Sequence, residues 1–359
     1  MKKLIIRRMD SRYFSQKVVE WYLKNKRNLP WRTTTDPYKV WLSEIILQQT
    51  RVQQGLPYYN QFVKNFPTVK ALALASEQTV LRTWQGLGYY TRARNLHQCA
   101  RIIVKQFNGK FPQRYVDLLE LPGIGSYTAA AIASICFNEP RAVLDGNVYR
   151  VLARVFGIHQ PVNSSAGKQT FAELADALID KTNPALFNQA MMEFGALFCP
   201  PKKPLCSQCL FKKQCVAYAG DLQFELPVKL KKKATRKRYF NYVVFRSGKS
   251  LFMKKRTDKD IWNGLYDFYL LESSRPVTIQ THLNKADIDL AKLLKRNGKV
   301  LRNHRYKHVL SHQVVWARFG VIDTVPDKKY GVRKFNIKTV EKLPKPILIS
   351  RFLKDLQLL

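Results

Sequence analysis

The stretch LPGIGSYTAAAIAS, residues 121–134, decides the fold of the first half of this chain. Pro122, Gly123 and Gly125 favour a tight turn between two helical patterns, and the small residues after it let the second helix pack closely. The turn also leaves free backbone N–H groups at a helix N-terminus, where a phosphate binds well. The stretch therefore predicts a helix-hairpin-helix over 115–136, although a plain turn between helices has a similar pattern.

The net charge indicates the class of partner. The chain carries 62 Lys and Arg against 25 Asp and Glu, which gives +37 at pH 7. Such a field favours a polyanion, most economically nucleic acid. No apolar run approaches the ~18 residues of a membrane span, and the start MKKLIIRRMD has too short an apolar stretch for a signal peptide. We therefore expect a monomer in the cytoplasm, associated with the nucleoid, that binds DNA and no membrane.

The length of 359 residues suggests two domains, at roughly 150 residues each. Residues 1–222 are predicted to form an all-α domain, because apolar residues recur at helical spacing. Residues 223–238 are predicted to form a basic linker that lies along phosphates or is simply solvated, because VKLKKKATRKR (228–238) has seven basic residues and no acid. Residues 239–359 should form an α+β domain. Its expected strands are 239–246, 250–256, 266–272 and 311–323, and its expected helices lie near 285–296 and 344–357.

Four of the six cysteines form the pattern C-x6-C-x2-C-x5-C, at Cys199, Cys206, Cys209 and Cys215. In a chain without an export signal, disulfides are disfavoured, and this spacing is typical of a metal site. Four thiolates satisfy either a tetrahedral zinc ion or a [4Fe–4S] cluster. Structural zinc sites often pair two tight C-x2-C units, whereas this chain has one such pair and long, unequal outer gaps. The spacing favours the cluster and leaves zinc as the alternative.

Two isolated carboxylates are candidate catalytic groups. Glu44 is the only acid between Asp36 and Glu77, and it falls inside an apolar helical run. Burial there should raise its pKa, so that it holds a proton near neutral pH. Asp145 is predicted to cap a helix, where backbone N–H groups and the helix dipole favour the ionised form. Together they suggest a general acid and an anionic partner, although a helix-surface acid and a simple cap would fit each residue separately.

These motifs together resemble the endonuclease III superfamily of base-excision DNA glycosylases. PYKVWLSEIILQQTRV (37–52), GLGYYTRARNL (86–96) and LDGNVYRVLARV (144–155) narrow the resemblance to the adenine DNA glycosylase (MutY-type) branch, over nearly all of residues 10–220. The resemblance implies an all-α helix-hairpin-helix glycosylase domain with a [4Fe–4S] loop over 199–215. It also implies a second, α+β domain that resembles a Nudix fold.

The resemblance further implies which chemistry the chain performs. Bifunctional members of the superfamily carry a lysine two residues after the second hairpin glycine, and this chain has Tyr127 there. A tyrosine forms no Schiff base, so we expect base removal without strand cleavage through this residue. The enzyme must flip adenine out of the duplex. Glu44 would then protonate adenine N7, while Asp145, with Asn147 beside it, would support the charged sugar electrostatically or by transient covalent capture, as in retaining glycosidases.

Two further sets of residues are carried over from the branch. The first would line the adenine pocket, although Trp31 fits an ordinary core equally well: Arg27, Leu29, Trp31 and Glu193. The second resembles a wedge that fills the gap left by the flipped base and props the opposite strand: Gln49, Thr50, Leu87 and Tyr89.

The second domain is expected to read 8-oxoguanine opposite the adenine. The catalytic box of Nudix hydrolases is missing after residue 239, so pyrophosphate hydrolysis is not expected. IWNGLYDF (261–268) is similar to the branch's glycine-led motif, and HVLSHQ (308–313) aligns with its lesion-sensing loop, usually Phe-Ser-His. Leu310 replaces the Phe, which leaves a smaller apolar wedge, whereas Ser311 and His312 keep the polar contacts. His312 would otherwise be an ordinary turn residue.

The sequence thus predicts a monofunctional glycosylase that removes adenine opposite 8-oxoguanine or guanine in double-stranded DNA. One alternative is a thymine or pyrimidine mismatch glycosylase of the same fold. Tyr127 excludes only its lysine-dependent version. The other alternative is a non-catalytic iron-sulfur protein that binds DNA, which the presence of both Glu44 and Asp145 argues against.

Overall fold

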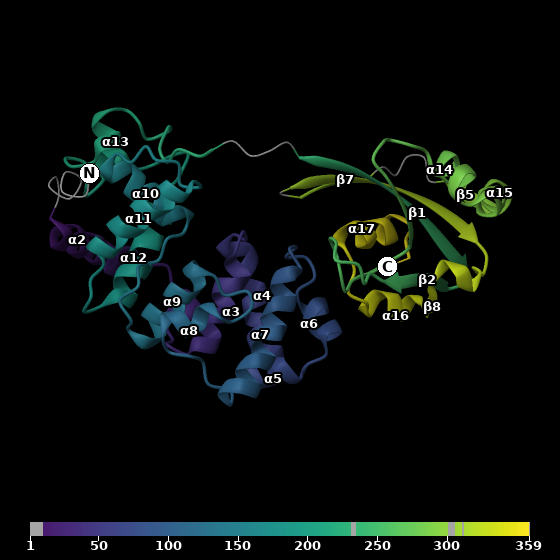
Figure 1. Ribbon diagram of the computed structural model, residues 1–359, viewed down its shortest axis with the longest axis horizontal. Helices are drawn as coiled ribbons and strands as arrows, with labels where there is room; N and C mark the ends of the chain where they lie inside the picture. The colour runs from purple at the N-terminus through teal and green to yellow at the C-terminus, as the bar shows by residue number, and fades with distance from the viewer. Residues whose placement is uncertain (1–9, 231–234, 301–305, 311, 359) are drawn as a thin grey trace. The chain divides into compact units, whose positions relative to one another are not determined.

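A computed structural model describes residues 10–230, 235–300, 306–310 and 312–358. The chain divides into two compact units. The first comprises Met1–Leu74 with Asn95–Lys231, and the second comprises Ala75–Arg94 with Lys232–Leu359. The colours of Figure 1 follow the chain through both units.

The described residues of the first unit form helices and no strand, which confirms the helical prediction. The helix α7 begins in the second unit and continues in the first. The α-helices are α2 (Ser11–Asn25), α3 (Pro37–Leu47), α4 (Val52–Asn65), α5 (Val69–Leu74), α7 (Thr91–Phe107), α8 (Tyr115–Leu119), α9 (Ser126–Phe137), α10 (Gly146–Phe156), α11 (Ser165–Leu178), α12 (Pro184–Leu197) and α13 (Val216–Ala219). Two 3₁₀ turns accompany them, η1 (Pro30–Arg32) and η2 (Cys206–Gln208).

The core of the first unit joins α2, α10, α11 and α12 to the cysteine-bearing loop. Phe14 of α2 stacks on Phe211 of that loop, with ring centroids 4.6 Å apart, and Phe194 of α12 meets Phe211 edge-on at 5.7 Å. All three rings are buried. Burying a phenylalanine contributes roughly 1.5–3 kcal/mol, so this cluster fixes α2 and α12 relative to the cysteine-bearing loop.

The hairpin predicted from residues 121–134 lies between α8 and α9. Gly123 adopts a positive φ of 82°, and a Cβ added there would lie 2.7 Å from Asn95 Cβ on α7. Only glycine combines that backbone with that close approach. Gly125 then caps α9, whose residues from Thr128 to Ile135 are all buried, so α9 is packed on every side.

The second unit is built on a mixed sheet. Its longest strands, β1 (Arg236–Ser247) and β7 (Gln313–Asp323), run parallel, from Arg236 opposite Gln313 to Arg246 opposite Asp323. The other pairings are antiparallel. The remaining strands are β2 (Ser250–Lys255), β3 (Tyr266–Asp267), β4 (Tyr269–Ser273), β5 (Gly298–Val300), β6 (Tyr306–Val309) and β8 (Arg333–Asn336). The helices are α6 (Glu77–Thr83), α14 (Ile279–Ala286), α15 (Ile288–Asn297), η3 (Lys328–Tyr330), α16 (Ile337–Lys342) and α17 (Ile347–Asp355).

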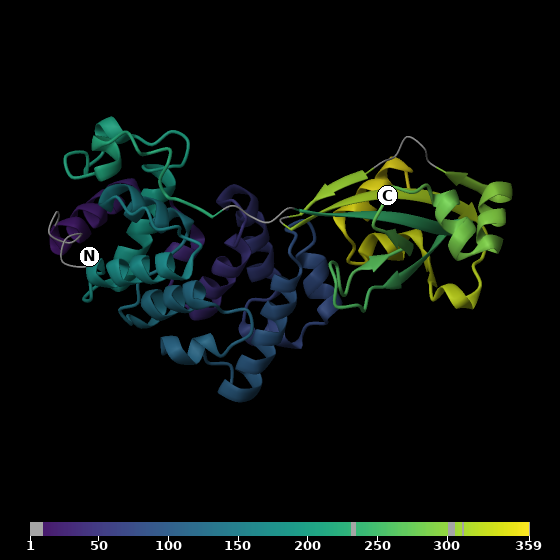
Figure 2. The ribbon, with the colours of Figure 1, turned by 45° about the horizontal axis from the view of Figure 1, so that its top comes forward.

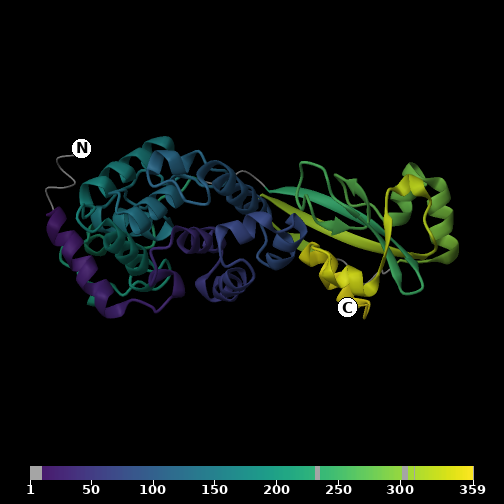
Figure 3. The same cartoon turned by 90° about the horizontal axis from the view of Figure 1, so that it is seen from below.

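Helices cover both faces of this sheet. Neighbouring strand residues point to opposite faces, so each face presents apolar side chains on which a helix packs. Val243 of β1 packs in a core with α14 and α15. Its neighbour Tyr242 stacks on Phe319 of β7, which stacks on Phe352 of α17 at 3.8 Å. Figure 2 and Figure 3 show α14 and α15 in light green and the yellow C-terminal helix at separate places against the sheet.

The division of the chain differs from the predicted boundaries in two ways. β1 begins at Arg236, inside the expected linker, because residues 236–238 pair with β7. Residues 75–94, expected in the first domain, belong to the second unit, where Lys255 of β2 pairs with Glu77 of α6 at 3.2 Å. None of the described helices combines the length and apolarity that crossing a membrane requires.

The hairpin generates a stability prediction. Gly123→Ala should destabilise the chain by roughly 1–2 kcal/mol for the left-handed backbone alone, and further because the methyl group meets Asn95. Gly109→Ala is the matched control, since Gly109 also has a positive φ (79°) but open space around it. Urea unfolding, followed by the helical circular dichroism signal, measures both. An equal loss in the two variants would contradict the close packing at Gly123.

Candidate active site

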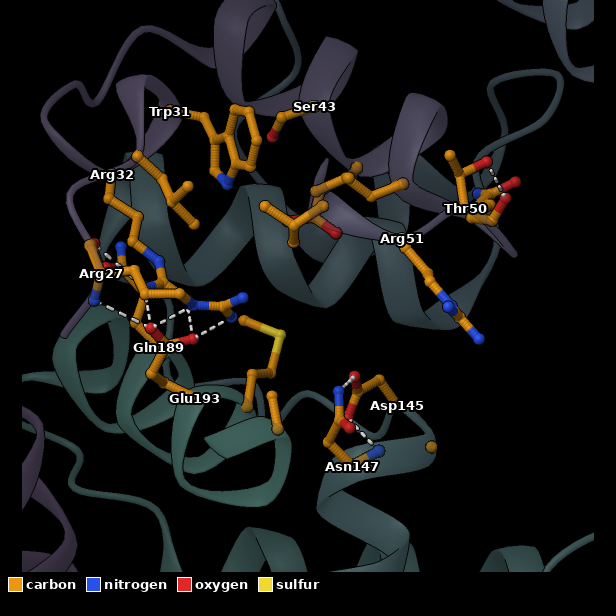
Figure 4. A pocket seen from close by; sticks show the side chains of 18 of the residues that line it. Arg27, Trp31, Arg32, Ser43, Thr50, Arg51, Asp145, Asn147, Gln189 and Glu193 are labelled. Carbon is orange, nitrogen blue, oxygen red and sulfur yellow. Dashed lines mark hydrogen bonds and ion pairs between the residues drawn. The ribbon is translucent and has the colours of Figure 1, made fainter. Parts of the chain in front are cut away.

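The largest group of predicted site residues lines one cavity of about 800 Å³ in the first unit. The cavity lies among η1, α3, the loop after α3, α9, the start of α10, and α12. Figure 4 shows side chains from these elements converging on it. Its volume is that of a site for a small molecule or a single base.

Glu44 reaches the cavity from the middle of α3. Asp36 caps this helix and Pro37 starts it, and the run Val40–Ile46 is buried throughout, so Glu44 is enclosed with only 8% of its surface exposed. Tyr127 of α9 donates its hydroxyl to Glu44 Oε2 at 2.5 Å. Burial raises the pKa of Glu44 to about 7, and the Tyr127 hydrogen bond lowers it in part. Glu44 therefore holds a proton near neutral pH, as its sequence context indicated.

Asp145 caps α10 at another wall of the cavity. Its Oδ1 accepts from the amides of Asn147 and Val148, each at 2.8 Å, and its Oδ2 accepts from Asn147 Nδ2 at 2.6 Å (Figure 4). Burial raises the pKa of Asp145, although these hydrogen bonds and Arg150 oppose that shift. Both carboxyl pKa values are thus raised, whereas helix capping alone suggested opposite directions. Three donors on Asp145, against one on Glu44, still make Asp145 the more easily ionised of the two.

Arg150 holds this arrangement in place and was missed by the sequence analysis. Its Nη2 donates to Asn147 Oδ1 at 2.9 Å and to the Gly195 carbonyl at 2.7 Å, and its Nε donates to the Cys199 carbonyl at 2.7 Å. A Cβ added at Gly195 would lie 2.7 Å from Asn147 Cβ, so α12 approaches α10 closely here. Arg150 therefore connects Asn147 to the first cysteine of the loop.

A third carboxylate, Glu193 of α12, is fully buried between two guanidinium groups. Arg27 donates to it through Nε at 2.8 Å and Nη2 at 2.5 Å, and Arg32 donates through Nη1 and Nη2, both at 2.7 Å. Burial alone would raise the pKa of Glu193, but the Arg27 and Arg32 hydrogen bonds outweigh it and lower the pKa to about 2. Glu193 is consequently ionised, and it can only accept hydrogen bonds. Arg32 was also missed by the sequence analysis.

The remaining predicted residues lie in several different places. Leu29, Trp31, Gln49 and Thr50 line the cavity, and Trp31 also packs edge-on against Tyr59 at 5.0 Å. Gly123 and Gly125 form the hairpin and do not line the cavity. Leu87, Tyr89 and His312 belong to the second unit, and Ser311 lies outside the described residues. Leu87 is buried, whereas Tyr89 is 39% exposed.

The four cysteines line a separate small cavity together with Arg154. The Phe211 amide donates to Cys209 Sγ at 3.4 Å, and Arg154 Nη1 donates to Cys199 Sγ at 3.2 Å. Within the described part of the chain, no three or more His, Cys, Asp or Glu side chains are placed to hold a single metal ion. The four sulfurs thus line one cavity, and two of them accept hydrogen bonds, but they are not arranged around a single metal ion. Four thiols around a common space fit the donor set of an iron-sulfur cluster.

Comparisons with known proteins identify the family of the chain. Residues 42–176 match the model of the HhH-GPD superfamily of base excision DNA repair proteins. The adenine DNA glycosylase of Buchnera aphidicola (subsp. Acyrthosiphon pisum) is 32% identical over 97% of this chain and 100% of its own length. The human adenine DNA glycosylase is 43% identical over 57% of this chain and 39% of its own length.

Solved structures match over half of the chain. A thermostable thymine-DNA glycosylase is 28% identical, with a TM-score of 0.55, over 58% of this chain and 97% of its own. Endonuclease III in a non-covalent DNA complex shares the fold at 19% identity, with a TM-score of 0.51, over 59% of this chain and 96% of its own. Since the Buchnera relative is matched along its full length, this chain belongs to the adenine DNA glycosylase family of the HhH-GPD superfamily.

Proposed function

We propose that the chain hydrolyses the glycosidic bond of adenine paired with 8-oxoguanine or guanine in double-stranded DNA. The observation that carries this proposal is the buried Glu44, whose pKa is raised to about 7, in the same cavity as Asp145. Because adenine within a base stack is out of reach, the base must first be flipped into this cavity. Family membership and the net charge of +37 support DNA as the substrate.

Glu44 acts as the general acid. Tyr127 occupies its Oε2, so Oε1 is the atom that carries the transferable proton. Transfer to adenine N7 lets the ring accept the electron pair of the breaking bond to the sugar, and adenine leaves as a neutral base. The same Tyr127 stands where bifunctional relatives have a lysine, so no covalent amine intermediate forms.

Asp145 acts on the other product of bond cleavage, the positively charged sugar. Its ionised carboxylate stabilises the oxocarbenium-like carbon electrostatically or by a transient covalent bond, and water completes hydrolysis. Asn147 and Arg150 hold the carboxylate in one orientation. Such fixed charge costs no reorganisation during the reaction.

To reach the fully buried Glu193, the incoming base must displace one of the Arg27 or Arg32 hydrogen bonds. Glu193 then provides a reason for adenine rather than thymine. An ionised carboxylate accepts hydrogen bonds, and adenine offers an exocyclic amino donor where thymine offers a carbonyl oxygen. Arg27 and Arg32 keep Glu193 ionised across the physiological pH range. A thymine in the same place would set two acceptors against each other, which disfavours the mismatch glycosylase alternative.

The first prediction for this site concerns the proton. Glu44→Gln should bind mispaired duplex normally, while single-turnover adenine release falls by about two orders of magnitude or more. In the unaltered enzyme the rate should fall about tenfold per pH unit above pH 7, because Glu44 loses its proton there, and it should fall again in acid, where Asp145 gains one. The matched control is Glu20→Gln on the exposed part of α2, which should leave the rate unchanged. A Glu44→Gln rate within a few-fold of the original would refute the assignment.

The second prediction concerns the cysteine loop. Cys199, Cys206, Cys209 and Cys215 would hold a [4Fe–4S] cluster, whose contribution is to order the basic loop rather than to take part in hydrolysis. The purified protein should be brown, with about four iron atoms per chain, and Cys209→Ser should lose both colour and DNA affinity. The buried Cys99 on α7 offers the control, since Cys99→Ala should keep its iron. One zinc ion per colourless chain would overturn this proposal.

The third prediction concerns the second unit, which we propose reads 8-oxoguanine through Ser311 and His312 on a Nudix-like fold. Each base-edge contact is worth roughly 1–3 kcal/mol of discrimination. Ser311→Ala combined with His312→Ala should therefore remove most of the preference for A:8-oxoG over A:G and change A:G cleavage little. Deleting residues 239–359 is a less selective test, since it strips α6 of its partners. An equal fall on both substrates would make this unit a general DNA clamp.

A further inference from the structure

The glycine-led turn at 261–265 is a feature of the second unit that the proposed function leaves without a role. On one side it contacts the segment 77–94. Arg94 at the start of α7 donates to the Asn263 carbonyl at 2.5 Å. Gly264 has a φ of 81°, and a Cβ there would lie 3.1 Å from Leu81 Cδ1 on α6. The turn therefore contacts both α6 and the first residues of α7.

On its other side the same turn contacts β6, the strand that leads into the proposed lesion-reading loop. The Trp262 ring lies 5.7 Å from the ring of His308. Trp262 is buried and has a positive φ of 62°. One turn thus touches both the segment that carries Tyr89 and the strand before Leu310.

The turn has a fixed shape, so it can transmit a displacement from one side to the other. Asn263 Nδ2 donates to the carbonyls of Thr257 and Asp258, at 3.0 and 2.6 Å. The backbone of Arg256 bonds Gly264 and Leu265, at 2.8 and 2.9 Å. These bonds hold both ends of the turn together and leave little freedom between Trp262 and Gly264.

The segment 77–94 has two more anchors, one in the turn between α16 and α17 and one on α17. Tyr90 donates its hydroxyl to the carbonyl of Lys345 at 3.4 Å, and Gln85 Nε2 donates to Ser350 Oγ at 3.2 Å. With the Arg94 bond, these contacts hold the segment on both sides of the loop at 86–89.

Internal hydrogen bonds hold the loop at 86–89 in one shape, so a displacement of its anchored ends displaces the whole loop. Trp84 Nε1 donates to the Gly88 carbonyl at 2.9 Å. The guanidinium of Arg92 lies 4.9 Å from the Trp84 ring and donates to the carbonyls of Leu87 and Gly88, at 3.4 Å each. Tyr89 is left partly exposed, with a φ of 48°.

We propose that the turn 261–265 couples the lesion-reading loop to the wedge loop, so that contact with the base opposite adenine sets how far Tyr89 enters the base stack. Arg94 and Tyr90 are positioning residues in this coupling, since neither needs to touch DNA. The inference rests on the function proposed above for Ser311, His312 and Tyr89. The new element is that lesion contact and Tyr89 insertion into the base stack occur together, because the turn 261–265 links the two loops.

Hydrogen exchange in the DNA-free protein tests the coupling directly. Arg94→Met with Tyr90→Phe removes two donors at nearly constant volume, and should speed amide exchange about tenfold in 85–90 and also in 306–310. Arg101→Met is the matched control, because Arg101 is on the same helix and donates to the Ala73 carbonyl within the first unit. It should change neither segment. Faster exchange in 85–90 alone would overturn the proposal, because the anchors would then be local.

A second measurement uses duplex DNA with 2-aminopurine beside the base opposite an uncleavable adenine analogue, so that its emission reports insertion of Tyr89. The emission should be greater for 8-oxoguanine than for guanine, and the Arg94→Met, Tyr90→Phe variant should lose this difference. Adding His312→Ala to that variant should have no further effect. If His312→Ala alone leaves the emission and the cleavage preference unchanged, the proposed lesion reading fails, and hydrogen exchange still decides whether the two loops are coupled. An emission difference that survives in the Arg94 and Tyr90 variant would overturn the coupling.

Discussion

The enclosure of the Glu44 carboxyl group is the constraint on which the rest of the candidate site depends. Raising its pKa from 4.5 to about 7 corresponds to about 3 kcal/mol between its two protonation states. An acid whose pKa is higher in the folded chain than in the unfolded chain lowers folding stability at any pH above its unfolded pKa, because ionisation then favours the unfolded chain. Folded stability falls as the pH rises from about 4.5, and the full cost is reached above about 7. The buried run of α3, and its packing on α9, must supply at least that much.

The other two carboxyl groups of the cavity have more hydrogen-bond donors than Glu44, and these donors offset the cost of burial. Asp145 is buried too, but the N-terminus of α10 and the Asn147 amide solvate its charge. The Glu193 carboxylate is paired with the guanidinium groups of Arg27 and Arg32. A buried carboxylate with full hydrogen bonding stays ionised, whereas one with a single donor keeps its proton. The three carboxyl groups of one cavity thus differ in how readily they ionise because they differ in their donors.

The sequence allowed prediction of the parts whose physics is local. An apolar run identifies α3 and the burial of Glu44, and an aspartate before a helix identifies the cap at Asp145. Arg32 and Arg150 could not be found this way, because their partners Glu193 and Cys199 lie 161 and 49 residues away. The place of residues 75–94 was also missed, since their anchors include the carbonyls of Asn263 and Lys345, and a backbone acceptor leaves no mark in the residue types.

That discontinuous second unit has a consequence for synthesis of the chain. The segment 75–94 leaves the ribosome before the rest of the second unit. Residues 95–231 must be synthesised before any of its C-terminal partners exist. At the usual rate of elongation this interval is roughly 7 to 30 seconds. During it, the side of α6 that Gly264 later covers has no partner from the C-terminal part of the chain. Leu81 and Val80 on that helix are fully buried in the finished fold. The nascent chain therefore carries an unfinished apolar helix throughout this interval, a period in which chaperone binding would be most useful.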